Sequence, residues 1–109
     1  MTPHGTATDA QRQLIEACLR RGVPFWWQGP GTLLISAVGV QAVIEDVESS
    51  GLRVVGLEGF ELASPDVHPR LDLIYDAGVA QRGSAAAVVA DWDAKVWVDV
   101  TLGSGAGEA

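Results

Sequence analysis

Hydrophobic side chains recur at helical spacing in two stretches of the chain. Between about residues 8 and 21 and between about residues 38 and 50, the apolar positions fall on one side of a helix. Thr8 or Asp9 can cap the start of the first helix, and Gly22 can end it. The two apolar stripes consist of Leu14, Ile15, Cys18 and Leu19, and of Val40, Val43, Ile44 and Val47.

Other stretches predict β-strands. Residues 23–28 and 32–36 flank a Gly-Pro-Gly turn, which predicts a β-hairpin. Residues 52–57 are rich in β-branched side chains and predict a short strand. The clearest strand covers residues 96–102, where apolar side chains at even positions alternate with Trp, Asp and Thr.

The remaining segments are less regular. Residues 58–70 contain two prolines and predict a long irregular loop, with a short strand at residues 60–62 as an alternative within it. Residues 71–77 fit either a helical turn or a short strand. Residues 85–92 predict a third helix with Ser84 as its N-cap.

Helices and strands are therefore mixed without strict βαβ alternation. This order predicts an α+β fold with a single mixed or antiparallel sheet and about three helices packed on it. The 109 residues correspond to a single domain, 1–109, and residues 1–8 and 103–109 are expected to be flexible tails.

Charge narrows the classes of partner. Fourteen acidic residues outnumber seven basic ones, which gives a net charge of −7. Nucleic acids and anionic membranes are unsuitable partners because both need clusters of Lys and Arg. A basic protein surface is the natural complement.

The first eight residues lack a signal-peptide pattern, and no apolar stretch is long enough to span a membrane, so we expect a cytoplasmic protein. The single cysteine, Cys18, lies on an apolar stripe and is expected in the core.

The acidic residues gather in the middle of the sequence. Between residues 45 and 76 there are eight acidic residues and only two basic ones, Arg53 and Arg70. The first acidic residues of this stretch lie in the C-terminal half of the second predicted helix, where the helix dipole disfavours negative charge by some tenths of a kcal/mol each. The eight residues are Glu45, Asp46, Glu48, Glu58, Glu61, Asp66, Asp72 and Asp76.

Aromatic residues offer apolar anchors for a partner. Trp26 and Trp27 are adjacent on a predicted strand, so their side chains point to opposite faces. We expect Trp27 and Trp92 to pack in the core. For Trp26 and Trp97 the sequence leaves open whether the side chain is buried or faces a partner. Phe60, after a glycine-rich strand end, is either a surface anchor or a core plug.

Catalytic patterns are sparse. Asp72 and Asp76 would share a face if their segment were helical, and with His68 they offer one enzymatic alternative. A second alternative is an oligomerising module that uses residues 23–28 as an edge strand. We expect neither catalysis nor a cofactor or metal, and a monomer or weak homodimer.

Three segments resemble small bacterial immunity proteins of polymorphic toxin and contact-dependent inhibition systems. They are GLEGF at residues 56–60, PRLDLIYD at residues 69–76 and VDVTL at residues 98–102. The resemblance implies a non-enzymatic cytoplasmic protein that binds and neutralises a cognate toxin domain, and an acidic surface suits a basic nuclease. The residues expected to bind the toxin are Glu45, Glu48, Glu58, Phe60, Glu61, Asp66, Asp72, Tyr75 and Asp76, with Trp26 as a further candidate anchor.

Overall fold

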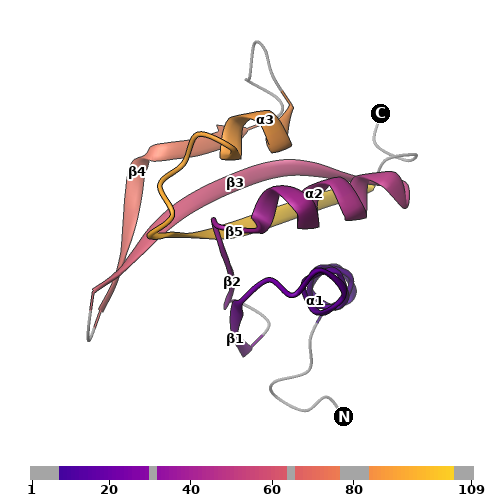
Figure 1. Cartoon of the computed structure of the whole chain (residues 1–109), viewed down its shortest axis with the longest axis horizontal. Coiled ribbons are helices and arrows are strands. Elements are labelled where there is room, and N and C mark those ends of the chain that lie inside the picture. The colour runs from indigo at the N-terminus through magenta and orange to yellow at the C-terminus, as the bar shows by residue number, and fades with distance from the viewer. Residues whose placement is uncertain (1–7, 30–31, 64–65, 77–83, 105–109) are drawn as a thin grey trace.

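The computed structural model describes residues 8–29, 32–63, 66–76 and 84–104. The chain forms helices and strands in the order α-β-β-α-β-β-α-β (Figure 1). The helices are α1 (Asp9–Arg21), α2 (Val40–Ser49) and α3 (Ala85–Val89). The strands are β1 (Phe25–Gly29), β2 (Thr32–Ser36), β3 (Leu52–Ala63), β4 (Asp66–Asp76) and β5 (Val96–Ser104).

Local signals set the ends of α1. The hydroxyl oxygen of Thr8 accepts a hydrogen bond from the backbone N–H of Gln11, and the Gln11 side-chain oxygen accepts one from the N–H of Thr8. This reciprocal pair satisfies two N–H groups that the first helical turn would leave unbonded. Gly22 ends the helix with φ +67°, a left-handed conformation that glycine adopts without steric cost. The predicted first helix is therefore confirmed, as is the Ser84 cap of α3, although α3 ends three residues earlier than expected.

The strands form one antiparallel sheet in the order β1-β2-β5-β3-β4. Two hairpins, β1–β2 and β3–β4, are joined by β5, the last strand in the chain, which pairs with β2 on one side and β3 on the other. The predicted α+β fold, with helices packed on a single sheet, is confirmed. The flexible tail expected over residues 103–109 is wrong for Gly103 and Ser104, which belong to β5, and residues 105–109 lie outside the described residues.

The loop predicted over residues 58–70 is wrong. Strand β3 continues to Ala63 and turns into β4, so His68 lies in a strand of the hairpin that projects to the left of Figure 1. Pro69 is tolerated because β4 is an edge strand, where a missing N–H breaks no ladder on the outer side. Residues 71–76 are strand and not helix, and an irregularity in pairing between Arg70 and Ile74 separates the two ends of β4.

The core lies on one face of the sheet. All three helices of the described chain contribute to it, together with alternate side chains of β2, β3 and β5. Cys18 is buried there as predicted, and burial raises the pKa of its thiol to about 11. Leu19 was expected in the apolar stripe of α1 but is 67% exposed, because the stripe narrows at the last helical turn. None of the described helices is long and apolar enough to cross a membrane.

Candidate functional site

The sheet has a second face, opposite the described helices. In β5, Val96, Val98 and Val100 point into the core, so the alternating Trp97 and Asp99 point the other way. We call this second side the open face. Strand alternation and pairing place on it Trp26, Leu34, Glu58, Phe60, Ile74, Trp97, Asp99 and Thr101.

Aromatic and aliphatic side chains cross the open face from strand to strand. Phe60 of β3 lies directly opposite Trp97 of β5, and Trp26 of β1 lies opposite Leu34 of β2. Opposed side chains on neighbouring strands have Cβ atoms about 4.5–5.5 Å apart, close enough to pack. Leu34 is only 4% exposed although it lies outside the main core, so the open face has a small apolar cluster of its own. Trp26 and Ile74 remain 37% and 50% exposed.

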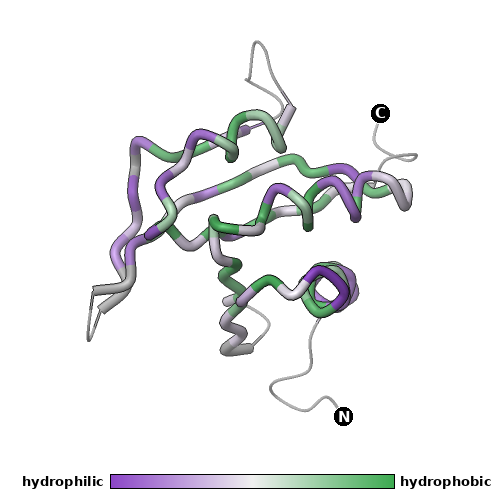
Figure 2. The backbone as a smooth tube through the Cα atoms, in the orientation of Figure 1, coloured by the Kyte–Doolittle hydropathy of each residue, from purple (hydrophilic) through white to green (hydrophobic). Residues whose placement is uncertain are grey.

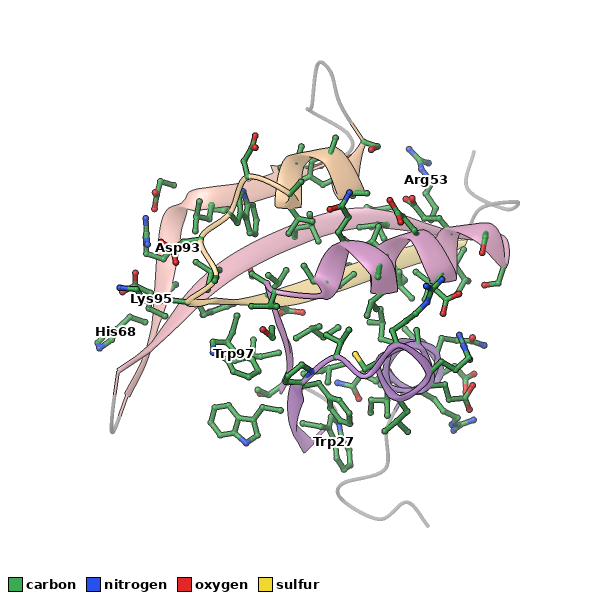
Figure 3. The ribbon with its side chains drawn as sticks, in the orientation of Figure 1. Trp27, Arg53, His68, Asp93, Lys95 and Trp97 are labelled. Atoms are coloured by element: carbon green, nitrogen blue, oxygen red, sulfur yellow. The ribbon has the colours of Figure 1, made fainter. Side chains whose placement is uncertain are left out.

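The two tryptophans labelled in Figure 3 illustrate the two sides. Trp27 lies on the α1 side of the β1–β2 hairpin, and its indole N–H donates a hydrogen bond of 3.2 Å to the side-chain oxygen of Gln11. Trp97 lies on the side of that hairpin away from α1. The predicted core position of Trp27 and the split between Trp26 and Trp27 are therefore confirmed, and Trp92 also packs against the core.

Two carboxylates face each other on the open face. Glu58 of β3 is paired directly with Asp99 of β5. Burial raises the pKa of Asp99, and the negative charge of Glu58 raises it further. Like charges at opposed positions of adjacent strands destabilise a sheet. This pair therefore opposes folding, and a positive charge placed beside it would relieve the repulsion.

Next to this pair lies a trough of about 530 Å³ on the open face between β3, β4 and β5. Its lining includes apolar Val55 and Ile74, carboxylates at Glu58 and Asp76, and Arg53. Gly56 also lines it, and a Cβ built at Gly56 would meet the side chain of Thr101 at 3.5 Å. The trough therefore has apolar walls close to negative charge.

The structure separates the predicted binding residues into three groups. Glu45 and Glu48 lie on α2, on the helical side of the sheet. Glu58, Phe60 and Asp76 lie on the open face or line its trough. Glu61 and Asp72 form the third group, in the β3–β4 hairpin, where Figure 2 shows a concentration of hydrophilic residues. Tyr75 packs partly against the core and also lines the trough, and the side chain of Asp66 lies outside the described residues.

Several of the acidic residues are held by arginines of the same chain. Arg70 donates to Glu61 at 2.7 Å and to Asp72 at 2.8 Å, which holds the pKa of Asp72 below its usual value. Asp46 pairs with Arg20 at 3.0 Å and with Arg21 at 3.6 Å, and the pKa of Asp46 is lowered as well. The acidity counted along residues 45–76 is thus partly neutralised within the protein, and its described side chains are divided between α2, the open face and the β3–β4 hairpin.

The sequence alone did not place Asp99 and Ile74 beside Glu58 and Phe60, and it left the place of Trp97 open. The alternation over residues 96–102 placed Trp97 and Asp99 on one side of a strand, but it did not show which neighbours would join them. Pairing of β5 with β3 supplies that information.

The enzymatic alternative gains little from the geometry. Asp72 is engaged by Arg70, and His68 lies exposed in the projecting hairpin, at the opposite end of the molecule in Figure 3 from Arg53, which lines the trough. Among the described residues, no group of three or more His, Cys, Asp or Glu side chains could hold a metal ion.

Comparisons of the chain with protein-family models, curated proteins and solved structures find no match.

Proposed function

We propose that this protein is an immunity protein that binds and neutralises a basic toxin domain in the cytoplasm, and that the open face is its binding surface. The observation that carries the proposal is the combination, on the side of the sheet opposite the described helices, of aromatic side chains with carboxylates. Trp97, Phe60 and Trp26 supply apolar anchors, and Glu58 and Asp99 supply negative charge beside them.

This combination suits a protein partner. Buried aromatic anchors, tryptophan above all, contribute most of the binding energy at protein interfaces. Acidic groups around them attract a basic partner and orient it during the encounter. The net charge of −7 acts in the same direction over longer distances. A basic nuclease is the toxin class that this charge complements. The resemblance at residues 56–60, 69–76 and 98–102 supports an immunity function and names no toxin class.

The first test is whether a gene beside the one for this chain encodes a secreted protein with a variable C-terminal domain, and the second uses that domain as a purified protein. We expect the purified domain to bind the wild-type protein and to lose its toxicity when both are produced in one cell. Trp97→Ala should weaken binding by about 30-fold, as for other interface hot spots. Isothermal titration calorimetry measures this change, and thermal unfolding shows whether the variant is folded.

Leu19→Ala is the matched control. It removes an exposed apolar side chain from α1, on the helical side of the sheet, and should leave binding within about twofold because surface truncations are nearly neutral. Failure of the wild-type protein to bind or neutralise the neighbouring domain would contradict the proposed function. Equal losses in both variants would contradict the placement of the surface.

An oligomerising module is the second candidate, because β1 is an edge strand and carries the exposed Trp26. Unpaired edge strands are templates for pairing with another chain. A stable dimer of the isolated protein that Trp26→Glu dissociates, measured by light scattering after gel filtration, would favour this candidate. The immunity proposal expects a monomer or weak homodimer at micromolar concentration.

A further inference from the structure

The trough on the open face has the form of a receptor for one long side chain. Its walls are aliphatic, with Val55 on β3 and the half-exposed Ile74 on β4. Gly56 contributes no side chain between them, so the space remains open above the backbone of β3. The volume of about 530 Å³ is sufficient for an extended side chain together with the backbone that carries it.

The charges around the trough favour a cation. Glu58 and Asp76 line it, and Asp99 lies opposite Glu58 on the next strand. Arg53 is the basic residue described in the lining, and the opposed pair of Glu58 and Asp99 outnumbers it. A cation beside Glu58 would reduce the repulsion that Glu58 and Asp99 exert on each other, whereas an anion would increase the crowding of negative charge.

Lysine and arginine combine the two properties that the trough selects. Both side chains have an apolar stem that packs on aliphatic surface and a charged head that stays at a polar rim. We propose that the open face binds its partner by taking a lysine or arginine side chain of that protein into the trough, with the stem on Ile74 and Val55 and the head at Glu58. This inference rests on the proposed function, since it names the group of the basic partner that the open face recognises.

The first experiment needs no toxin. It titrates the ¹⁵N-labelled full-length protein with the capped tripeptide acetyl-Gly-Arg-Gly-amide and follows backbone amide signals by NMR. We expect saturable shifts at residues 55–58, 74–76 and 101, with a dissociation constant on the order of 1 mM. The same peptide with citrulline in place of arginine keeps the shape but lacks the charge, and it should bind about tenfold more weakly.

Glu58→Gln tests the charged rim. We expect it to weaken binding of the arginine peptide about tenfold, because a charge-assisted hydrogen bond becomes a neutral one. Glu16→Gln is the matched control: it removes the same charge from an exposed site on α1, and it should leave the peptide affinity unchanged. If both variants weaken binding equally, or if the shifts spread over the acidic residues of α2, the peptide senses only the overall charge and the inference is wrong.

Ile74→Ala tests the apolar wall. The side chain is half exposed, so its removal is compatible with folding, and we expect about threefold weaker binding of the arginine peptide from the lost stem contact. An unchanged affinity in this variant would contradict the trough as the place of the stem.

The two proposals fail separately. If the toxin domain binds wild type and Glu58→Gln with equal affinity, the trough assignment is wrong and the proposed function stands. If the arginine peptide binds in the trough but no neighbouring toxin domain is neutralised, the proposed function is wrong and the trough remains a site for basic side chains.

Discussion

The two faces of the sheet differ in what they do for stability. On the covered face, β5 contributes Val96, Val98 and Val100 to a core shared with the helices of the described chain. On the open face the same strand presents Trp97 and Asp99, with no described helix above them. One strand thus serves two environments, because successive side chains point to opposite sides.

The open face contains features that folding alone would not favour. A half-exposed isoleucine, Ile74, stays in contact with water, and the carboxylates of Glu58 and Asp99 oppose each other across two strands. The carboxylate pair lowers stability slightly, and both features become favourable when a partner with an apolar surface and a positive charge covers the face. The comparison therefore separates residues that hold the fold from residues that are available for binding.

The largest expected effect is on the covered face. Leu57→Ala removes a fully buried side chain of β3 and should lower the free energy of unfolding by about 2–5 kcal/mol, from lost burial and the cavity left behind. Phe60→Ala, three residues further along the same strand but on the open face, should lower it by roughly 1–2 kcal/mol because Phe60 is only partly buried.

Urea unfolding followed by circular dichroism measures both changes. For affinity we expect the opposite order of effects from that for stability. Phe60→Ala should weaken binding of the toxin domain, and folded Leu57→Ala should not. A larger stability loss in Phe60→Ala than in Leu57→Ala would show that the open face is a second core.

Substitutions at two glycines of β3 should also distinguish the two faces, with smaller changes in stability than Leu57→Ala. A Cβ at Gly59 would lie 2.8 Å from Cβ of Leu73 and 3.1 Å from Cγ1 of Val96, so Gly59→Ala should overpack the core and lower stability by about 1–3 kcal/mol. A Cβ at Gly56 would meet Thr101 at 3.5 Å, an ordinary contact, so Gly56→Ala should be neutral or slightly stabilising. Thermal unfolding of the two variants measures what one added methyl group does to stability on each face of the sheet. Equal losses of stability would contradict the distinction between a packed covered face and a less crowded open face.

Helix α1 and the β3–β4 hairpin differ in how well the sequence predicts them. Helix α1 was predictable because its signals are local: Thr8 and Gly22 at its ends and an apolar stripe between them. The long β3–β4 hairpin was not, because its strands contain glycine and proline for reasons that lie elsewhere in the chain. Gly59 leaves room for Leu73, and Pro69 is acceptable only because β4 lies at the edge of the sheet.

The candidate site was harder to predict for the same reason. Acidic residues that are close in the sequence, such as Glu58 and Glu61, have different surroundings: Glu58 opposes Asp99, and Glu61 pairs with Arg70. Conversely, Phe60 and Trp97 are far apart in the chain but adjacent in the sheet. A list of acids along residues 45–76 could not show this, since it depends on the pairing of β3 with β5.

The smallest expected effect concerns the carboxylate pair. The pKa of Asp99 is raised in the folded protein by burial and by Glu58, so the folded state binds this proton more tightly than the unfolded chain does. The negative charge of Asp99 therefore lowers stability at neutral pH, and this penalty disappears as the pH falls through the raised pKa towards the unfolded value of about 3.9.

Asp99→Asn should accordingly increase the free energy of unfolding at pH 7 by roughly 0.2–1 kcal/mol, the range for opposed like charges on adjacent strands. At pH 3 the wild-type carboxyl is already protonated, so the difference should become small. Urea unfolding at the two pH values measures the stability gain, and an equally large gain at pH 3 would show that the asparagine acts by packing and not by removing repulsion.

With the arginine peptide bound, the cation at Glu58 should reduce the loss of stability caused by the Asp99 charge at pH 7. The gain from Asp99→Asn should then shrink at neutral pH, because the peptide offsets the same repulsion that the substitution removes.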